Sequence, residues 1–437
     1  MAGGRGWRSE RNVQCRIRSG VPNTMSVSFP PELAGLIQTI ERDHYARPES
    51  VLTPLRRLLQ HCTNSDQVAY TCEKLGFAHL RLAEHRMARV FYEHALQLQP
   101  DNFYILANLA HAVHELEDTS VAVRYGQQAL RLKDQAAMQG GPGELQPPHG
   151  GTRRLISFSL YGDNAKYCET AVLNCLAAQQ HFPGFVCRFH VDDTVPVAIL
   201  RRLEAQGAEI VSLSARRAEL FPTAWRFLPL DDQTADIVLV RDVDSLLDAR
   251  EAWCVQEWIA SGKPFHIIRD DCCHTELILA GLFAARAGVL GRIEEHLARF
   301  INAAGDRGAG RYSDQLFLRQ CIWPLVREHT VTHDRIYGYG TDVRSVPGEI
   351  PTASGLRNTF MGAAYATHQI RVSLEQPLAK SVHCRLRILD ERGGLICEHR
   401  LERVDDQTLQ ILLPPHYARH LENGTWKHEL LTQADPG

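Results

Sequence analysis

The chain contains, from Asp236 to Ser245, the sequence DIVLVRDVDS, in which a short apolar run ends in two aspartates one residue apart. Isoleucine, leucine and valine bounded by charged residues are typical of a buried strand. Side chains alternate along a strand, so Asp242 and Asp244 point the same way, ~7 Å apart along the backbone. In α/β sheets, ligands bind at the carboxyl ends of strands. Two hard carboxylates and a bound diphosphate can hold Mg²⁺ or Mn²⁺ there. The plainer interpretation is two polar residues that end a strand.

Composition places the chain among ordinary globular proteins. Its 437 residues are enough for two or three domains. Of these residues, 44% are hydrophobic and 23% are charged, which are ordinary proportions for a globular protein. A net charge of −3 gives no indication of a nucleic-acid partner. No apolar run approaches the ~20 residues of a transmembrane helix. The arginine-containing start lacks the apolar core of a secretory signal, so we expect residues 1–29 to be a disordered tail, with Met25 as an alternative start.

Twelve cysteines occur, none in a C-x-x-C spacing, which argues against a zinc knuckle or a redox motif. Free thiols in a reducing compartment are the simplest interpretation, so we predict a cytoplasmic protein. The run Cys272-Cys273-His274 looks like a metal cluster. Adjacent cysteines rarely ligate one ion well, so we do not expect a metal there.

Residues 30–138 have helical periodicity and a 34-residue repeat. The windows Ala69–Asn102 and Phe103–Ala136 place small residues at equivalent positions, where paired helices would approach closely. These windows resemble tetratricopeptide repeats, although the first lacks the opening Trp and the second the closing Pro. We expect Leu33 to Cys62 to supply capping helices. The small residues are Gly76, Ala88, Ala95, Ala110, Ala122 and Ala129.

A Gly- and Pro-rich linker at 139–152 precedes an alternation of strands and helices over 153–347, which predicts a mostly parallel α/β sheet. Residues 348–437 change to period two, which predicts a small antiparallel β region. The expected strands of the two regions are 155–160, 185–191, 209–213, 237–240, 265–268, 370–374, 382–388, 395–401 and 408–413. The expected helices are 164–180, one after Thr194 and Pro196, 248–260, 288–302 and 313–321.

The middle region resembles a GT-A-fold glycosyltransferase, with a Rossmann-like mixed sheet, of a bacterial type often joined to tetratricopeptide repeats. The resemblance covers roughly half of the chain. It rests on segments that occur in order: Leu155–Asp163, Trp225–Leu230, Arg241–Ser245 followed by Arg250-Glu251, Phe265–Asp270, Leu277–Leu282, Asp314-Gln315 and His333-Asp334.

The resemblance implies a divalent metal, Mn²⁺ or Mg²⁺, held by Asp242 and Asp244, with Asp242 contacting ribose in an alternative arrangement. His333 is the candidate third ligand, and its alternative is a solvated loop histidine. Arg226 and Arg241 are candidates to meet diphosphate charge, because guanidinium groups match phosphate oxygens. An ion pair of Arg241 with Glu251 is the alternative.

Tyr161 is placed to stack on a nucleotide base, or else packs on the sheet. Asp270 ends another apolar strand and is the first candidate for a base, with Asp271 and Glu276 as competitors. Asp314 and Gln315 are candidates to bind the donor sugar. Ser313 as a cap and an aspartate in the first turn are an equally good structural explanation of that segment.

Together these features predict a metal-dependent glycosyltransferase that moves a sugar from a nucleotide sugar, by family default a UDP-sugar, to an acceptor hydroxyl. The repeats would recruit an acceptor or partner protein, or support oligomerisation. An inverting and a retaining path both stay open. The alternatives are a repeat scaffold with an inactive α/β domain, and a nucleotidyltransferase.

Overall fold

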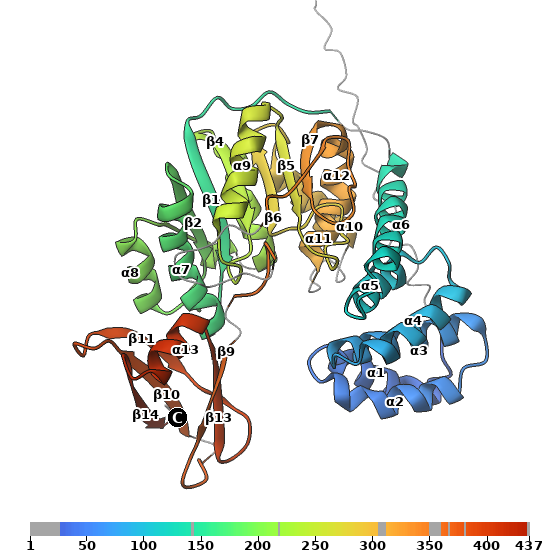
Figure 1. Ribbon diagram of the computed structural model, residues 1–437, viewed down its shortest axis with the longest axis horizontal. Coiled ribbons are helices and arrows are strands. Elements are labelled where there is room, and N and C mark those ends of the chain that lie inside the picture. Colours follow the sequence, from blue (N-terminus) through green and yellow to red (C-terminus); the bar gives the residue numbers. More distant parts are fainter. Residues whose placement is uncertain are drawn as a thin grey trace, which may run out of the picture.

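The computed structural model describes residues 27–140, 144–216, 219–304, 312–348, 360–365, 368–379 and 382–434. Of the expected tail, residues 1–26 lie outside these ranges, and so does the alternative start Met25. Three units follow one another along the chain. Figure 1 shows the helical N-terminal unit and the C-terminal unit on opposite flanks of a central sheet.

The N-terminal unit is helical, as its periodicity predicts, and consecutive helices pack against one another. The side chains of Asn64, Asn102 and Asp118 cap three of the helices by accepting hydrogen bonds from backbone N–H groups of the first turn. The helices are α1 Ala34–Asp43, α2 Pro48–Gln60, α3 Ser65–Arg81, α4 His85–Leu98, α5 Phe103–His114 and α6 Thr119–Ala137.

The 34-residue spacing has a structural counterpart at the helix contacts. A Cβ on Gly76 of α3 would come within 2.8 Å of the Tyr92 ring of α4, so glycine is required for this close approach. The position 34 residues after Tyr92 is Gly126 of α6, and there the packed ring is Tyr337 of the central unit. The central unit therefore supplies the aromatic ring that the second repeat lacks. The assignment to the tetratricopeptide family stays a prediction.

The central unit is an eight-stranded mixed sheet, in the order β3-β2-β1-β4-β6-β5-β7-β8. β6 runs antiparallel to both β4 and β5, and the other neighbouring pairs are parallel. The prediction of a mostly parallel sheet is confirmed. The strands are β1 Arg153–Leu160, β2 Phe185–Val191, β3 Glu209–Ser212, β4 Ala235–Arg241, β5 Phe265–Arg269, β6 Leu282–Arg286, β7 Thr330–Asp334 and β8 Val343–Arg344.

Helices cover both faces of this sheet, so the unit has three layers. One face carries α7 Ala165–His181, α8 Val197–Ala205 and α9 Ala249–Ser261. The other carries the 3₁₀ helix η4 Pro222–Asp231, α10 Ile293–Ala304, α11 Ser313–Phe317 and α12 Trp323–Val326. Leu130 of α6 belongs to the second core, so the helical unit packs on that side.

Ion pairs and hydrogen bonds fix the helical unit to the sheet. Lys133 of α6 is buried and donates to Glu276 Oε1 at 2.6 Å and to the Thr275 carbonyl at 2.9 Å. The next residue, Asp134, accepts from Trp323 Nε1 at 2.7 Å and from the Tyr339 hydroxyl at 2.8 Å. Because a buried charge left unpaired is costly, these contacts specify one docking position.

The C-terminal unit contains two three-stranded antiparallel sheets, where the sequence predicts one small sheet. It rests on α7 through buried Glu169, which pairs with His399 at 2.6 Å and with Arg202 at 2.7 Å. Tyr417 also donates to Glu169, at 2.8 Å. Its elements are β9 His368–Ser373, β10 Val382–Leu389, β11 Leu395–Arg400, β12 Glu402–Arg403, β13 Thr408–Leu413, α13 Pro415–Glu422 and β14 Lys427–Ala434.

One predicted boundary is wrong. The helix expected from residue 288 begins at Ile293, because Gly288 and Gly291 have positive φ and the Asp231 carboxylate accepts from Ile293 N at 2.7 Å. Residues 277–281 form a loop, and β6 begins at Leu282.

Candidate functional site

Several predicted residues meet at the carboxyl end of β4, on the face covered by η4 and α11. Val238 and Val240 of β4 pack into the core on this face, and alternation continued by two residues places Asp242 on the same side. Asp242 pairs there with Arg226 of η4, which also pairs with Asp314 of α11. The structure therefore brings together three side chains that lie far apart in the sequence.

Arg226 is the centre of this group. Its guanidinium is held between Asp242 and Asp314, with Asp314 Oδ2 2.7 Å from Nη2. Only 4% of the residue is exposed, and its backbone N–H donates to Ser159 Oγ of β1. Burial raises the pKa of Asp314, although the Arg226 charge opposes this shift. A buried cation between two carboxylates fixes the relative position of both acids.

Asp244 has a partner that the sequence reasoning missed. Lys166, in the first turn of α7, lies 2.6 Å from Asp244 Oδ2. Burial alone would lower the pKa of Lys166, but the Asp244 carboxylate more than offsets it, so the pKa is raised. The signal was available in the Asn164 cap, whose side chain accepts from Lys166 N and starts α7 directly after the first strand.

Tyr161 and Gln315 complete the rim. Tyr161 follows β1, is 40% exposed, and its ring meets that of Trp225 edge-on. Gln315 follows Asp314 in α11, and its Oε1 is buried without a hydrogen-bond partner in the described part of the chain. Arg226 Nε is likewise buried without a hydrogen-bond partner among the described residues. A buried polar atom without a partner marks a place where a ligand can bind.

Glycine is required in the loop before β6. A Cβ on Gly281 would overlap Oδ2 of Asp242 and come within 3.0 Å of its Cβ. The carboxylate thus lies directly on the backbone of this loop. The sequence analysis did not single out Gly281, because nothing local in the run Leu277–Leu282 indicates that β6 inserts beside β4.

The C-terminal segment crosses the same edge. Tyr365 N donates to the Asp244 carbonyl at 2.7 Å, and Ala364 forms a bridge with Ser245. This segment is held from the other side by Asp270, whose Oδ2 accepts from Met361 N at 2.8 Å. The backbone around Asp244 is therefore braced by residues more than 100 positions later in the chain.

Arg241 and His333 lie on the opposite face of the sheet, so the structure does not bring them to Asp242. Arg241 is buried and pairs with Glu251 of α9, as its alternative interpretation proposed. His333 is 0% exposed in β7, the third strand from β4, and is held by Glu257 of α9 at 2.9 Å. The predicted third metal ligand is therefore not assembled, because β5 and β6 separate the two strands.

Asp270 is also on the face of α9. Its side chain is 0% exposed, and Oδ1 accepts from Arg250 and Arg335, each at 2.8 Å. With Met361 N on the other oxygen, both oxygens have protein partners. A base must reach the proton that it abstracts. In this arrangement Asp270 instead positions the segment that follows Phe360.

Asp242 and Asp244 are the residues that could hold a divalent cation at this edge. The side chain of Asp242 is 41% exposed and that of Asp244 23% exposed, so each is accessible. Oxygen ligands suit Mg²⁺ and Mn²⁺, which complete their shells with water and phosphate oxygens. Neither acid belongs to a described group of three or more His, Cys, Asp or Glu side chains with converging ligand atoms. The donor set fits a cation only if a bound diphosphate contributes.

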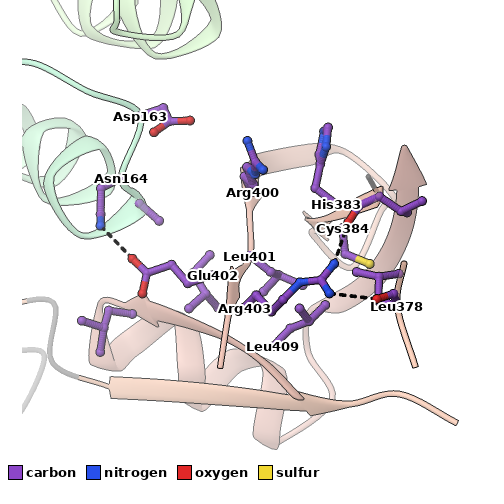
Figure 2. Close-up of a pocket in the computed structure, with 14 residues that line it drawn as sticks. Asp163, Asn164, Leu378, His383, Cys384, Arg400, Leu401, Glu402, Arg403 and Leu409 are labelled. Carbon is purple, nitrogen blue, oxygen red and sulfur yellow. Dashed lines mark hydrogen bonds between the residues drawn. The ribbon is translucent and has the colours of Figure 1, made fainter. Parts of the chain in front are cut away.

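A pocket of about 340 Å³ lies beside this site, between the start of α7 and the C-terminal unit (Figure 2). Glu402 closes one wall, where it accepts from Asn164 Nδ2 at 3.2 Å, and Arg403 donates to the Leu378 carbonyl at 2.8 Å. Asp163 and His383 also line it. Since Lys166 is two residues from Asn164, the pocket and Asp244 are separated by the first turn of α7.

Comparisons with known proteins give weak likenesses. No protein-family model matches the chain, and no curated protein matches it. Among solved structures, a mutant O-GlcNAc transferase from Thermobaculum terrenum aligns over 43% of this chain and 43% of its own length, with 13% identity and a TM-score of 0.22. A mannosyltransferase from Pyrobaculum calidifontis in complex with GDP-Man and Mn²⁺ aligns over 55% of this chain and 69% of its own length, with 14% identity and a TM-score of 0.29. TM-scores this low do not establish a shared fold.

In the described ranges, no helix combines the length and the apolar character needed to cross a bilayer.

Proposed function

We propose that this protein is a glycosyltransferase that moves a sugar from a nucleotide sugar to an acceptor hydroxyl. The observation that carries the proposal is the group of Asp242, Asp244, Arg226 and Lys166 at the carboxyl end of β4. Ligand sites of α/β sheets occupy this edge. The diphosphate of a sugar donor gains negative charge as it leaves, and the fixed cations beside these acids would stabilise that charge.

In this proposal Asp244 and Asp242 hold a Mn²⁺ or Mg²⁺ ion, which supplies charge stabilisation for the diphosphate. Lys166 and Arg226 already lie against these acids, so they contribute fixed positive charge at the same place. Tyr161 offers its exposed ring to the base, and Gln315 and Asp314 face the sugar. UDP-sugars are the first donors to test and GDP-sugars the second.

The acceptor would enter from the pocket of Figure 2. Its wall contains carboxylates and guanidinium groups, which suit hydroxyl recognition, and it lies one helical turn from Asp244. The helical repeats would present an acceptor-bearing protein. A cytoplasmic location belongs to the same proposal, supported by the free thiols at the eleven described cysteines.

Nucleotide binding tests the proposal directly. Full-length protein is titrated with UDP, with GDP and with the two triphosphates, with and without Mn²⁺, by calorimetry. We expect diphosphate binding that Mn²⁺ strengthens and that Asp244→Asn weakens by at least about tenfold. Asp236→Asn is the matched control, since Asp236 lies at the amino end of the same strand and pairs with Arg286.

Three results would contradict the proposal. If no nucleotide binds under any metal condition, the chain is better explained as a repeat scaffold. A preference for triphosphates over diphosphates would favour a nucleotidyltransferase. If Asp236→Asn weakens binding as much as Asp244→Asn, the effect is one of stability and the site lies elsewhere.

A further inference from the structure

A second group of metal-ligating side chains lies where the helical unit meets the sheet unit. His114, at the end of α5, faces Asp271 and Cys272, which follow β5. One ligand atom from each of the three lies within 4.8 Å of the others. The group joins two units of the chain, and it lies outside the site of Asp242 and Asp244.

The individual atoms suit a bound cation. Nδ1 of His114 is buried and has no hydrogen-bond partner in the described residues. Cys272 is 1% exposed, and its thiol makes a long contact of 3.7 Å to Asp271 Oδ1. His114 and Asp271 are half-buried, which leaves an ion access to water. Imidazole, thiolate and carboxylate are the three ligand types of protein zinc sites.

The distances also suit a small ion. Bonds of ~2.0–2.3 Å in a tetrahedral zinc site place ligand atoms ~3.5 Å apart. Side-chain adjustments of about 1 Å would therefore close this group on an ion.

The surrounding charge favours a cation. Glu115 acts electrostatically on Cys272, as Asp271 does, and both are carboxylates. His111 also interacts electrostatically with Asp271. Two carboxylates therefore act on the thiol, and their charge attracts a cation.

The other described group of this kind differs in one decisive way. Glu169, Cys397 and His399 converge between α7 and the C-terminal unit. The Arg202 guanidinium lies 2.7 and 2.8 Å from the two Glu169 oxygens. His399 and Tyr417 contact these two oxygens as well, so no oxygen of this buried carboxylate is open to an ion. Among the described contacts of His114, Asp271 and Cys272, no arginine or lysine lies within hydrogen-bonding distance.

We propose that His114, Asp271 and Cys272 bind a zinc-type transition metal that joins the helical unit to the sheet unit. Water would take the fourth position on the exposed side, as in sites with three protein ligands. Binding requires loss of the Cys272 proton, which passes to solvent. His274 is not part of the site, because its Nδ1 accepts from Asp270 N at 3.0 Å. Within the run Cys272-Cys273-His274, the Cys272 side chain therefore belongs to the proposed site and the His274 side chain does not.

The site has a structural consequence. Asp271 and Cys272 begin the loop that ends at Gly281, which lies on Asp242. An ion that binds only the docked arrangement stabilises that arrangement by mass action. Metal binding would therefore hold the loop and the helical unit in the positions seen in the structure.

Cobalt titration tests this proposal. Full-length protein is stripped of metal with a chelator under reducing conditions and titrated with Co²⁺, and near-ultraviolet absorption of a cobalt–thiolate bond is recorded. We expect one equivalent of Co²⁺ to produce this band, and Zn²⁺ to remove it. Cys272→Ser and His114→Ala should each weaken Co²⁺ binding at least tenfold. Cys273→Ser, the neighbouring thiol, is the matched control and should keep the band.

Melting temperature gives a second readout. Zn²⁺ should raise the melting temperature of the wild type and of Cys273→Ser but not of Cys272→Ser, with far-ultraviolet dichroism of the metal-free variants unchanged. Asp244→Asn should keep the cobalt band, since the other site has no sulfur, so the two proposals can fail independently. A wild type without the band, or a band lost in Cys273→Ser and retained in Cys272→Ser, would overturn the assignment.

Discussion

Replacement of Gly281 by alanine is the sharpest test of the candidate site. The new Cβ would overlap Oδ2 of Asp242 and come within 3.0 Å of its Cβ, so the carboxylate must move by at least about 1 Å. The side chain of Asp242 is 41% exposed, so the displaced carboxylate can turn toward solvent while Arg226 keeps its pair with Asp314, which limits the cost to folding. A displacement of this size in a reacting group costs about 100-fold in rate, equivalent to about 2.7 kcal/mol in the barrier.

The assay is the hydrolysis or transfer rate with the nucleotide sugar that binds best, measured as kcat/KM at saturating Mn²⁺. Gly348→Ala is the control, because a Cβ there meets no atom of the described residues within 4 Å. We expect the control to match the wild type and Gly281→Ala to lose about two orders of magnitude in kcat/KM at nearly unchanged melting temperature.

A double-mutant cycle identifies the cause. If Gly281→Ala acts by displacing Asp242, the same change should have little further effect in an Asp242→Ala background. Wild-type kcat/KM in Gly281→Ala would refute the reasoning, because Asp242 could then be displaced without consequence. Fully additive effects of the two substitutions would show that Gly281 acts by another route.

Three further predictions follow from other contacts. Lys166→Met should increase the affinity of Asp244 for Mn²⁺, because the acid loses its ion pair, and calorimetry measures this change. The same substitution should slow turnover at least about tenfold, because a fixed cation is lost, and initial rates measure this effect. Burial opposes ionisation of Glu169, but His399 and Arg202 hold its pKa near about 2, below the ordinary 4.5. This contribution of about 3 kcal/mol to the free energy of unfolding is present above pH 4.5 and is lost as pH falls toward 2. Glu169→Gln should therefore lower the free energy of unfolding, measured by urea denaturation, by about that amount at pH 7 and by progressively less below pH 4.5. Gly126→Ala would overlap the Tyr337 ring, so it should destabilise docking of the helical unit by about 1–3 kcal/mol, which limited proteolysis detects as faster cleavage near residues 139–152.

Local patterns predicted most of the secondary structure. The strands at 155–160, 185–191 and 382–388 and the helix capped at Asp248 are found close to their predicted bounds. Apolar periodicity and capping are properties of neighbouring residues, so they can be read along the chain. β14 and α13 were missed, because β14 is a polar strand with the sequence KHELLTQA and carries no clear alternation.

The sheet order was not accessible in the same way. Which strands become neighbours depends on contacts between distant segments, and β6 turns back between β4 and β5 without a local signal. This insertion, together with the alternation of side chains, sorted the predicted residues onto two faces. Asp242 and Arg226 came together, while His333 and Asp270 were placed under α9. Residue type predicted chemistry, but strand order decided which chemistry could be combined.

The loop between β5 and β6 connects these findings physically. It begins with Asp271 and Cys272 beside His114, and it contacts Lys133 of α6 through the Thr275 carbonyl at 2.9 Å. It ends at Gly281, against Asp242. A displacement of the helical unit would therefore be transmitted along one short segment to an acid of the candidate site. Packed interfaces favour discrete arrangements over gradual deformation, so docking of the helical unit and the geometry of that acid are expected to change together.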